Sequence, residues 1–120
     1  FDDAEIIAGQ GTAMQELLRE VGHVDALVLP VGGGGLISGS ALVSKVFSPE
    51  AQIFGVEPAE ANDAQQSLEK GEIVTIPSPV TIAAGARVRT IPEPTADPRK
   101  KRVDELITAT YTFDPALRIR

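Results

Sequence analysis

The chain has 120 residues, of which 42% are hydrophobic and 23% are charged, which suits one buried core and argues against wholesale disorder. A formal net charge of −6 and an aromatic content of 4% make a nucleic-acid partner unfavourable. The absence of cysteine excludes disulfides and thiolate metal sites, and no apolar run approaches the ~20 residues that a membrane helix needs.

The first half of the chain predicts a helix followed by a buried strand. Residues 12–21 have apolar residues at helical spacing, with Thr12 and Gln15 in the form of a capping box, and glycines at 9 and 11 predict a turn before them. The run "VDALVLPV" (24–31) lacks polar alternation, which is typical of a central parallel strand covered on both faces. His23 lies between the two and is expected to be a surface loop residue.

The next elements alternate in type. Residues 36–47 predict a helix that ends at Ser48-Pro49, residues 51–57 predict a strand, and residues 61–71 predict a helix ending at Lys70-Gly71. This order predicts an α/β fold with a parallel sheet and right-handed crossovers.

Beyond about residue 75 the pattern weakens. Five prolines interrupt it, and the basic run 99–102 is expected to be a solvated segment. Residues 103–113 allow a short strand with a helical lead-in. The chain opens with Phe1 and its only methionine is Met14, so we expect it to be a piece of a longer protein.

The stretch "PVGGGGLIS" (30–38) joins the first strand to the second helix. Glycines there let the backbone approach an anion, while the helix N-terminus supplies a favourable dipole, so phosphate binding is the leading hypothesis. A Walker loop is excluded because the required lysine is missing. A dinucleotide fingerprint stays open: Gly33, Gly35 and Ser38 give G-x-G-x-x-S, and Glu57 stands where a ribose-binding acid would be.

Four motifs occur in an order that resembles one enzyme family: "IIAGQGT", "VDALVLPVGGGGLISG", "VEPAEANDA" and "TIAAG". The family is that of the pyridoxal-phosphate-dependent serine/threonine dehydratases and serine racemases. The resemblance implies a tryptophan-synthase-β-like α/β fold with helices on both faces of a parallel sheet. It implies that the chain is a C-terminal fragment, about a third of a family member. Residues 1–90 would belong to the cofactor-binding domain, and residues 91–120 form a divergent, proline-rich and basic tail.

The resemblance also assigns binding residues. It implies that four glycines hold the phosphate of pyridoxal 5'-phosphate and that Gly85 of "TIAAG" lies beside the cofactor ring; Ala84 departs from the acid that relatives often carry there. A divalent cation, Mg²⁺ or else Ca²⁺ or Mn²⁺, would be held by two carboxylates and a backbone carbonyl. The open alternative is an acidic turn that caps the 61–71 helix. The implied phosphate residues are Gly32, Gly33, Gly34 and Gly35, and the implied metal ligands are Glu57, Ala61 and Asp63.

The implied reaction is ammonia release from serine- or threonine-like β-hydroxy amino acids to give a 2-oxo acid, or racemisation. The family's Schiff-base lysine corresponds to no residue of this chain, so we assign no catalytic residue to it and expect the 120 residues alone to be inactive. The intact enzyme is expected to be a cytoplasmic homo-oligomer that takes a small amino-acid substrate. Two alternatives remain, a Rossmann-type nicotinamide-binding module and a non-catalytic remnant of the fold.

Overall fold

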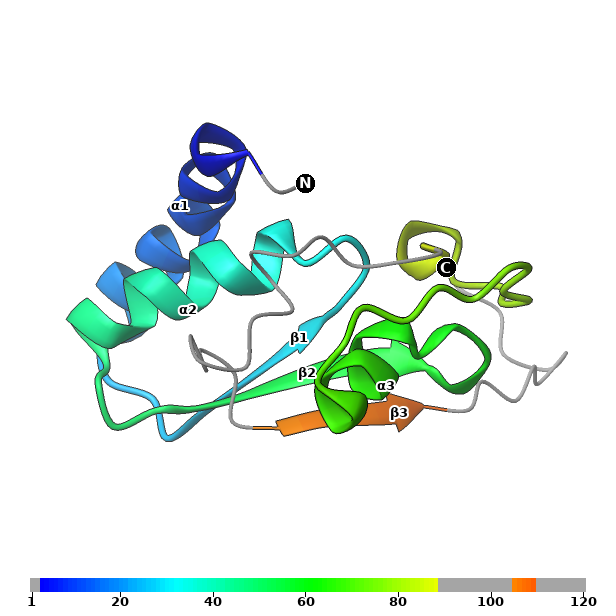
Figure 1. Ribbon diagram of the computed structural model, residues 1–120. Helices are drawn as coiled ribbons and strands as arrows, with labels where there is room; N and C mark the ends of the chain where they lie inside the picture. The colour runs from blue at the N-terminus through cyan, green and yellow to red at the C-terminus, as the bar shows by residue number, and fades with distance from the viewer. Residues whose placement is uncertain (1–2, 89–104, 110–120) are drawn as a thin grey trace, which may run out of the picture.

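The computed structural model describes residues 3–88 and the backbone of residues 105–109 (Figure 1). None of the helices in these residues is both long and apolar enough to cross a membrane. In chain order the elements are α1 (Ala4–Val21), β1 (Ala26–Pro30), α2 (Gly35–Phe47), β2 (Gln52–Pro58), the 3-10 helix η1 (Ala59–Ala61), α3 (Asp63–Lys70), the 3-10 helix η2 (Ala84–Ala86) and β3 (Glu105–Ala109).

The described strands form one parallel sheet in the order β1-β2-β3 (Figure 1). Leu27 of β1 pairs with Ile53 of β2, and Phe54 pairs with Glu105 at the start of β3. Parallel neighbours need a crossover connection, and α2 lies in the chain between β1 and β2 as α3 lies between β2 and β3. The predicted α/β class with a parallel sheet is therefore confirmed.

β3 lies within the segment 103–113, where a short strand was expected. Its pairing with β2 shows that part of the predicted tail continues the sheet. The expected helical lead-in and the basic run 99–102 lie outside the described residues. The predicted domain boundary at residue 90 also falls there, so it stays a prediction.

One face of the sheet carries the core. Leu27 and Ile53 are register partners and share this face, because side chains alternate along a strand. All three described α-helices contribute to the same cluster, whereas the resemblance also implies helices on the opposite face. The cluster consists of Met14, Leu18, Leu27, Val31, Ile37, Ala41, Ile53 and Ala64.

β1 differs from the strand predicted over residues 24–31. Among the described strands it lies at the edge of the sheet, and alternate residues Ala26, Val28 and Pro30 are exposed, with 64% of Val28 accessible. The prediction of a central strand buried on both faces is therefore wrong for the described residues. A continuous apolar run shows that both faces of a strand are apolar, but it cannot show which neighbours cover them.

α1 begins eight residues before the predicted helix over 12–21. Asp3 is its N-cap and accepts a hydrogen bond from the Glu5 amide at 2.8 Å, while the Thr12 hydroxyl donates to the Gly9 carbonyl inside the helix. The predicted glycine turn and capping box are therefore wrong. Close packing of α1 against α2 explains the glycine at position 11, because a Cβ on Gly11 would lie 2.9 Å from the Gly39 carbonyl oxygen of α2.

The remaining elements lie close to their predicted bounds. α2 ends at Phe47 with Ser48 as its C-cap, and α3 ends at Lys70. Gly71 takes the left-handed conformation with φ 70°, which glycine adopts at little cost, so the Lys70-Gly71 ending is confirmed. These ends follow from local backbone preferences, and this is why the sequence locates them well.

Candidate functional site

The glycine run forms the connection from the end of β1 to the start of α2, as the sequence predicts. Gly34 is the N-cap of α2 in the left-handed conformation, with φ 83°, and it provides no side-chain cap. The first amides of a helix have no acceptor within the helix, and the first turn of α2 carries no acidic residue. This junction therefore presents open N–H donors and the positive end of the helix dipole, which together favour an anion.

Gly85 lies against the same loop. A Cβ built on Gly32 would come within 2.8 Å of the Gly85 carbonyl oxygen and 3.6 Å of the Ala86 Cα. Only glycine at position 32 allows the two backbone segments to approach this closely. The fold therefore brings together "PVGGGGLIS" and "TIAAG", two motifs that lie far apart in the sequence.

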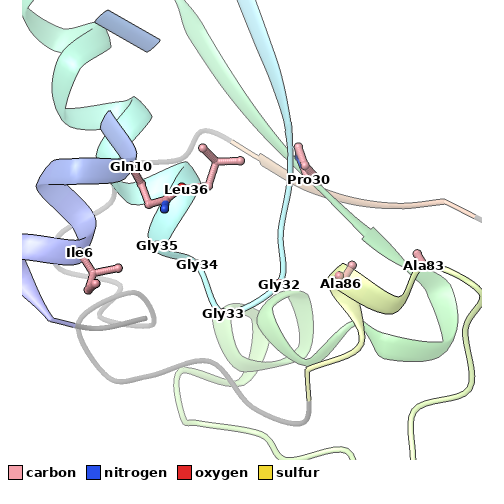
Figure 2. Close-up of a pocket in the computed structure, with 11 residues that line it drawn as sticks. Ile6, Gln10, Pro30, Gly32, Gly33, Gly34, Gly35, Leu36, Ala83 and Ala86 are labelled. Carbon is pink, nitrogen blue, oxygen red and sulfur yellow. The ribbon is translucent and has the colours of Figure 1, made fainter. Parts of the chain in front are cut away.

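A cavity of about 460 Å³ opens between these segments and α1, within the usual size range of small-molecule sites (Figure 2). Backbone and apolar side chains form most of its wall, and Gln10 of α1 is the exception. The contribution of α1 was not predicted, because the glycines at 9 and 11 indicated a turn where the helix continues. The described lining residues are Ile6, Gln10, Pro30, Gly32, Gly33, Gly34, Gly35, Leu36, Ala83, Gly85 and Ala86.

Glu57 stands at the second strand-to-helix junction, where β2 leads to α3. Its carboxylate accepts hydrogen bonds from the Ala64 amide at 3.1 Å and the Gln65 amide at 2.9 Å, and the residue is 1% exposed. It thus caps α3 from the preceding strand, whereas the N-cap residue Asn62 makes no side-chain cap bond. Such a carboxylate is not free to reach a ribose, which removes the support for the dinucleotide hypothesis.

Burial at this junction disfavours the charged forms of two carboxyl groups, those of Glu57 and Asp63. The pKa of Glu57 is raised to about 7: desolvation is the largest cause, the two amide hydrogen bonds lower the pKa, and the nearby charge of Asp63 raises it. Desolvation also raises the pKa of Asp63. The Asp63 carboxylate is buried, and its Oδ2 has no hydrogen-bond partner among the described residues.

The implied metal ligands are thus close in space. Glu57 and Asp63 interact electrostatically, and Ala61 is buried at the end of η1 between them in sequence. Across the described ranges 3–88 and 105–109, no group of three or more His, Cys, Asp or Glu side chains could hold a metal ion. A metal here would depend on two carboxylates and a backbone oxygen, and it stays a proposal.

His23 follows α1 and has a structural role. Its Nδ1 lies 2.8 Å from the Ser48 hydroxyl, its side chain is 56% exposed, and its Nε2 lies 4.0 Å from an Asp25 carboxylate oxygen. The Ser48 hydroxyl also donates to the Val24 carbonyl and accepts from the Val24 amide. The cluster fixes the end of α2 against the entry to β1, away from the cavity-lining residues.

Comparison with known proteins identifies the family. The sequence profile of the family "Pyridoxal-phosphate dependent enzyme" matches residues 1–114. The chain belongs to this family. It is 50% identical over 110 residues to the L-threo-3-hydroxyaspartate ammonia-lyase of Saccharomyces cerevisiae and 47% identical to the serine racemase of Schizosaccharomyces pombe. In both matches 92% of this chain aligns with 34% of the relative.

Solved structures agree with the family match. The structure of the processed form of threonine deaminase isoform 2 from Solanum lycopersicum aligns with a TM-score of 0.85 and 36% sequence identity, over 92% of this chain and 30% of that chain. The neighbours are pyridoxal-phosphate enzymes of the tryptophan-synthase-β-like fold, so the fold implied by the resemblance is confirmed. The chain spans about a third of the length of the curated relatives that it matches.

Proposed function

We propose that this chain supplies the phosphate-binding part of a pyridoxal-phosphate-dependent ammonia-lyase or racemase that acts on serine- or threonine-like β-hydroxy amino acids. The observation that carries the proposal is the β1–α2 junction, where four glycines open onto a cavity in a chain of this family. Relatives named hydroxyaspartate ammonia-lyase and serine racemase support the substrate class. The rest of the catalytic machinery would lie outside these 120 residues.

The residues present fit the cofactor. The backbone amides of Gly32–Gly35 would donate to the phosphate, and the backbone at Gly85 would lie beside the ring. A side chain at position 32 would fill this cradle, since a Cβ there already meets the Gly85 carbonyl oxygen at 2.8 Å. The site uses neutral donors and the α2 dipole, because the described lining residues include neither lysine nor arginine.

The chemistry divides between cofactor and protein. Bound pyridoxal phosphate supplies the electron sink that allows a bond at the substrate α-carbon to break. This chain's role is to orient the cofactor through its phosphate. Its apolar side chains Ile6, Leu36 and Ala86 would form one wall of the site and keep water out there. Over the whole reaction, a lyase would convert a β-hydroxy amino acid to a 2-oxo acid and ammonia, whereas a racemase would invert the α-carbon.

The described lysines do not stand where the cofactor would be held. Lys45 lies in the last turn of α2 and Lys70 in the last turn of α3. At about 1.5 Å rise per residue, Lys45 lies roughly 15 Å along α2 from Gly35. We therefore propose that the 120-residue chain is inactive alone, and measurable 2-oxo acid formed by the isolated chain from threonine or serine would contradict this.

A divalent cation at the β2–α3 junction is a second proposal. The Asp63 Oδ2, which has no partner in the part of the chain that the structure describes, supports it beside the buried Glu57, because hard oxygen donors suit Mg²⁺, Ca²⁺ or Mn²⁺. Glu57, the Ala61 carbonyl and Asp63 would be the protein ligands. Calorimetric titration of the chelator-treated protein with each chloride salt tests this, with Asp63→Asn as the variant expected to lose binding and absence of heat in the wild type as the contrary result.

The cofactor proposal is tested on the complete protein that contains this chain. Purified protein is freed of cofactor and titrated with pyridoxal phosphate, and separately with NAD, while the absorbance of the bound cofactor is recorded. Protein that has bound pyridoxal phosphate is then supplied with L-serine, L-threonine and L-threo-3-hydroxyaspartate.

We expect pyridoxal phosphate to bind, NAD not to bind, and 2-oxo acid or D-amino acid to form. Cofactor binding without any product would indicate the non-catalytic remnant, and NAD binding alone would support the nicotinamide-binding alternative.

A further inference from the structure

The wall of the cavity that faces the glycine loop belongs to α1. Ile6 and Gln10 are four residues apart and therefore lie on one face of the helix, and both line the cavity. Figure 2 shows the Gln10 side chain extending from α1 toward Gly35, at the start of α2. α1 reaches this position only because it begins at Ala4 and continues through Gly9 and Gly11.

Gln10 is chemically distinct from its neighbours in this wall. The other described lining residues are glycine, alanine, proline, leucine and isoleucine, so its carboxamide is the single side-chain hydrogen-bonding group among them. Gln10 is exposed, and its side chain has no hydrogen-bond partner within the described part of the chain. A free donor that extends into a cavity is available to a ligand.

A phosphate held by backbone amides needs further donors. The β1–α2 junction offers N–H groups from one side only, while a bound phosphate dianion has three terminal oxygens that all accept hydrogen bonds. The described lining contains no cationic side chain to serve the remaining oxygens. The side-chain amide nitrogen of Gln10, Nε2, extends from the facing helix and is placed to donate to one of these oxygens.

We propose that the Gln10 carboxamide donates a hydrogen bond to the cofactor phosphate and so completes the cradle from the α1 side. This inference rests on the proposed function, since it requires pyridoxal phosphate to occupy the cavity. It makes Gln10 a cofactor-binding residue that the glycine motif alone does not include. Glutamine also suits the position because it donates without adding charge, whereas a glutamate would repel the phosphate.

The test uses the complete cofactor-free protein with two ligands, pyridoxal phosphate and pyridoxal, which lacks the phosphate. Gln10→Met keeps the length and helix propensity of the side chain but removes the donor, and Gln10→Glu replaces the donor with a charge. Gln15→Met is the matched control, since Gln15 lies on α1 but does not line the cavity. The dissociation constant is measured for the wild type and each variant with each of the two ligands. The ³¹P chemical shift of bound pyridoxal phosphate is also recorded.

We expect Gln10→Met to weaken pyridoxal phosphate binding by about ten- to hundredfold, the loss typical of one hydrogen bond to a charged group, and to leave pyridoxal binding unchanged. Gln10→Glu should weaken it further, the ³¹P shift should change in Gln10→Met, and Gln15→Met should behave as wild type. Equal losses for both ligands, or no loss for either, would overturn the inference. A wild type that fails to bind pyridoxal phosphate would instead overturn the proposed function.

Discussion

The two strand-to-helix junctions of this sheet begin alike and treat the helix N-terminus in opposite ways. β1 leads to α2 through glycines that leave the first amides of the helix open, whereas β2 leads to α3 with Glu57 bonded to two of its amides. The register places apolar Val31 beside acidic Glu57, because their preceding residues Pro30 and Val56 are partners. We propose that the first junction receives an external anion, whereas the second carries the Glu57 carboxyl group of the chain itself.

We propose that anion binding depends on the first junction and that the second, besides its candidate cation site, stabilises the fold. At the β1–α2 junction the groups that would bind are backbone amides, and side chains are excluded by the approach of Gly85 to Gly32. At the β2–α3 junction the fold uses a buried carboxylate whose pKa is raised to about 7. Substitutions at the first should therefore alter ligand affinity, while substitutions at the second should alter folding.

Of the substitutions at the two junctions, Gly32→Ala is expected to have the largest effect. The added Cβ would meet the Gly85 carbonyl oxygen at 2.8 Å, so one backbone segment must shift and the cradle must distort. We expect pyridoxal phosphate to bind about ten- to hundredfold more weakly, measured by titration of the cofactor-free protein. Gly9→Ala is the control, since its Cβ meets nothing within 4 Å. Equal affinity in Gly32→Ala and Gly9→Ala would break the comparison.

Glu57→Ala should act on folding. It removes the acceptor of the Ala64 and Gln65 amides and leaves the start of α3 uncapped. We expect the free energy of unfolding to fall by about 2 kcal/mol, measured by urea denaturation with a chelator present. If the variant unfolds at the wild-type urea concentration, Glu57 does not cap α3 in the way described.

The pH dependence of stability should reveal the same residue. The pKa of Glu57 is raised from 4.5 to about 7 in the folded chain, so the folded state holds a proton that the unfolded state has released between these values. The contribution of Glu57 is therefore fully present below about pH 4.5 and is lost as the pH rises through about 7, a loss on the order of 3 kcal/mol. Urea denaturation from pH 5 to 8 measures it, and Glu57→Gln should flatten this decline. A wild type and a Glu57→Gln variant with parallel profiles would contradict the raised pKa.

Inorganic phosphate alone should produce the smallest effect. Bound at the β1–α2 junction, phosphate at ten times its dissociation constant should stabilise the cofactor-free protein by about 1.4 kcal/mol, measured by thermal unfolding against chloride of matched ionic strength. Gly32→Ala should reduce the stabilisation to about 0.4 kcal/mol or less, and Gly9→Ala should retain it in full. Stabilisation that survives in Gly32→Ala would place the anion elsewhere.

The sequence locates the glycine run of the first junction correctly but does not reveal the cap at the second. A glycine run between an apolar strand and a helix indicates an anion site from local chemistry alone, and the ends of α2 and α3 follow from Ser48 and Gly71. The capping role of Glu57 was not predicted, because the sequence offered only a local acidic turn as the cap of the 61–71 helix. The capping bonds instead join a strand end to a helix start seven and eight residues later.

Two other features depended on contacts that no local pattern reveals. Gly9 and Gly11 predict a turn when considered alone, but Gly11 packs against Gly39 and allows α1 to continue. That continuation brings Gln10 to the cavity. Predicting a turn at residues 9–11 therefore also concealed Gln10 as a candidate cofactor-binding residue. Similarly, the apolar run of β1 gave no sign that Val28 would be exposed among the described residues.

The central claim is that the backbone amides of the β1–α2 junction hold the phosphate of the cofactor. Its most direct test is the amide NMR spectrum of the complete protein labelled with ¹⁵N-glycine, recorded while inorganic phosphate and then pyridoxal phosphate are added. We predict that the signals of Gly33, Gly34 and Gly35 move with both ligands, while those of Gly22 and Gly71, which end α1 and α3 and do not line the cavity, stay in place. Movement of other glycines with the junction signals unchanged would contradict the claim.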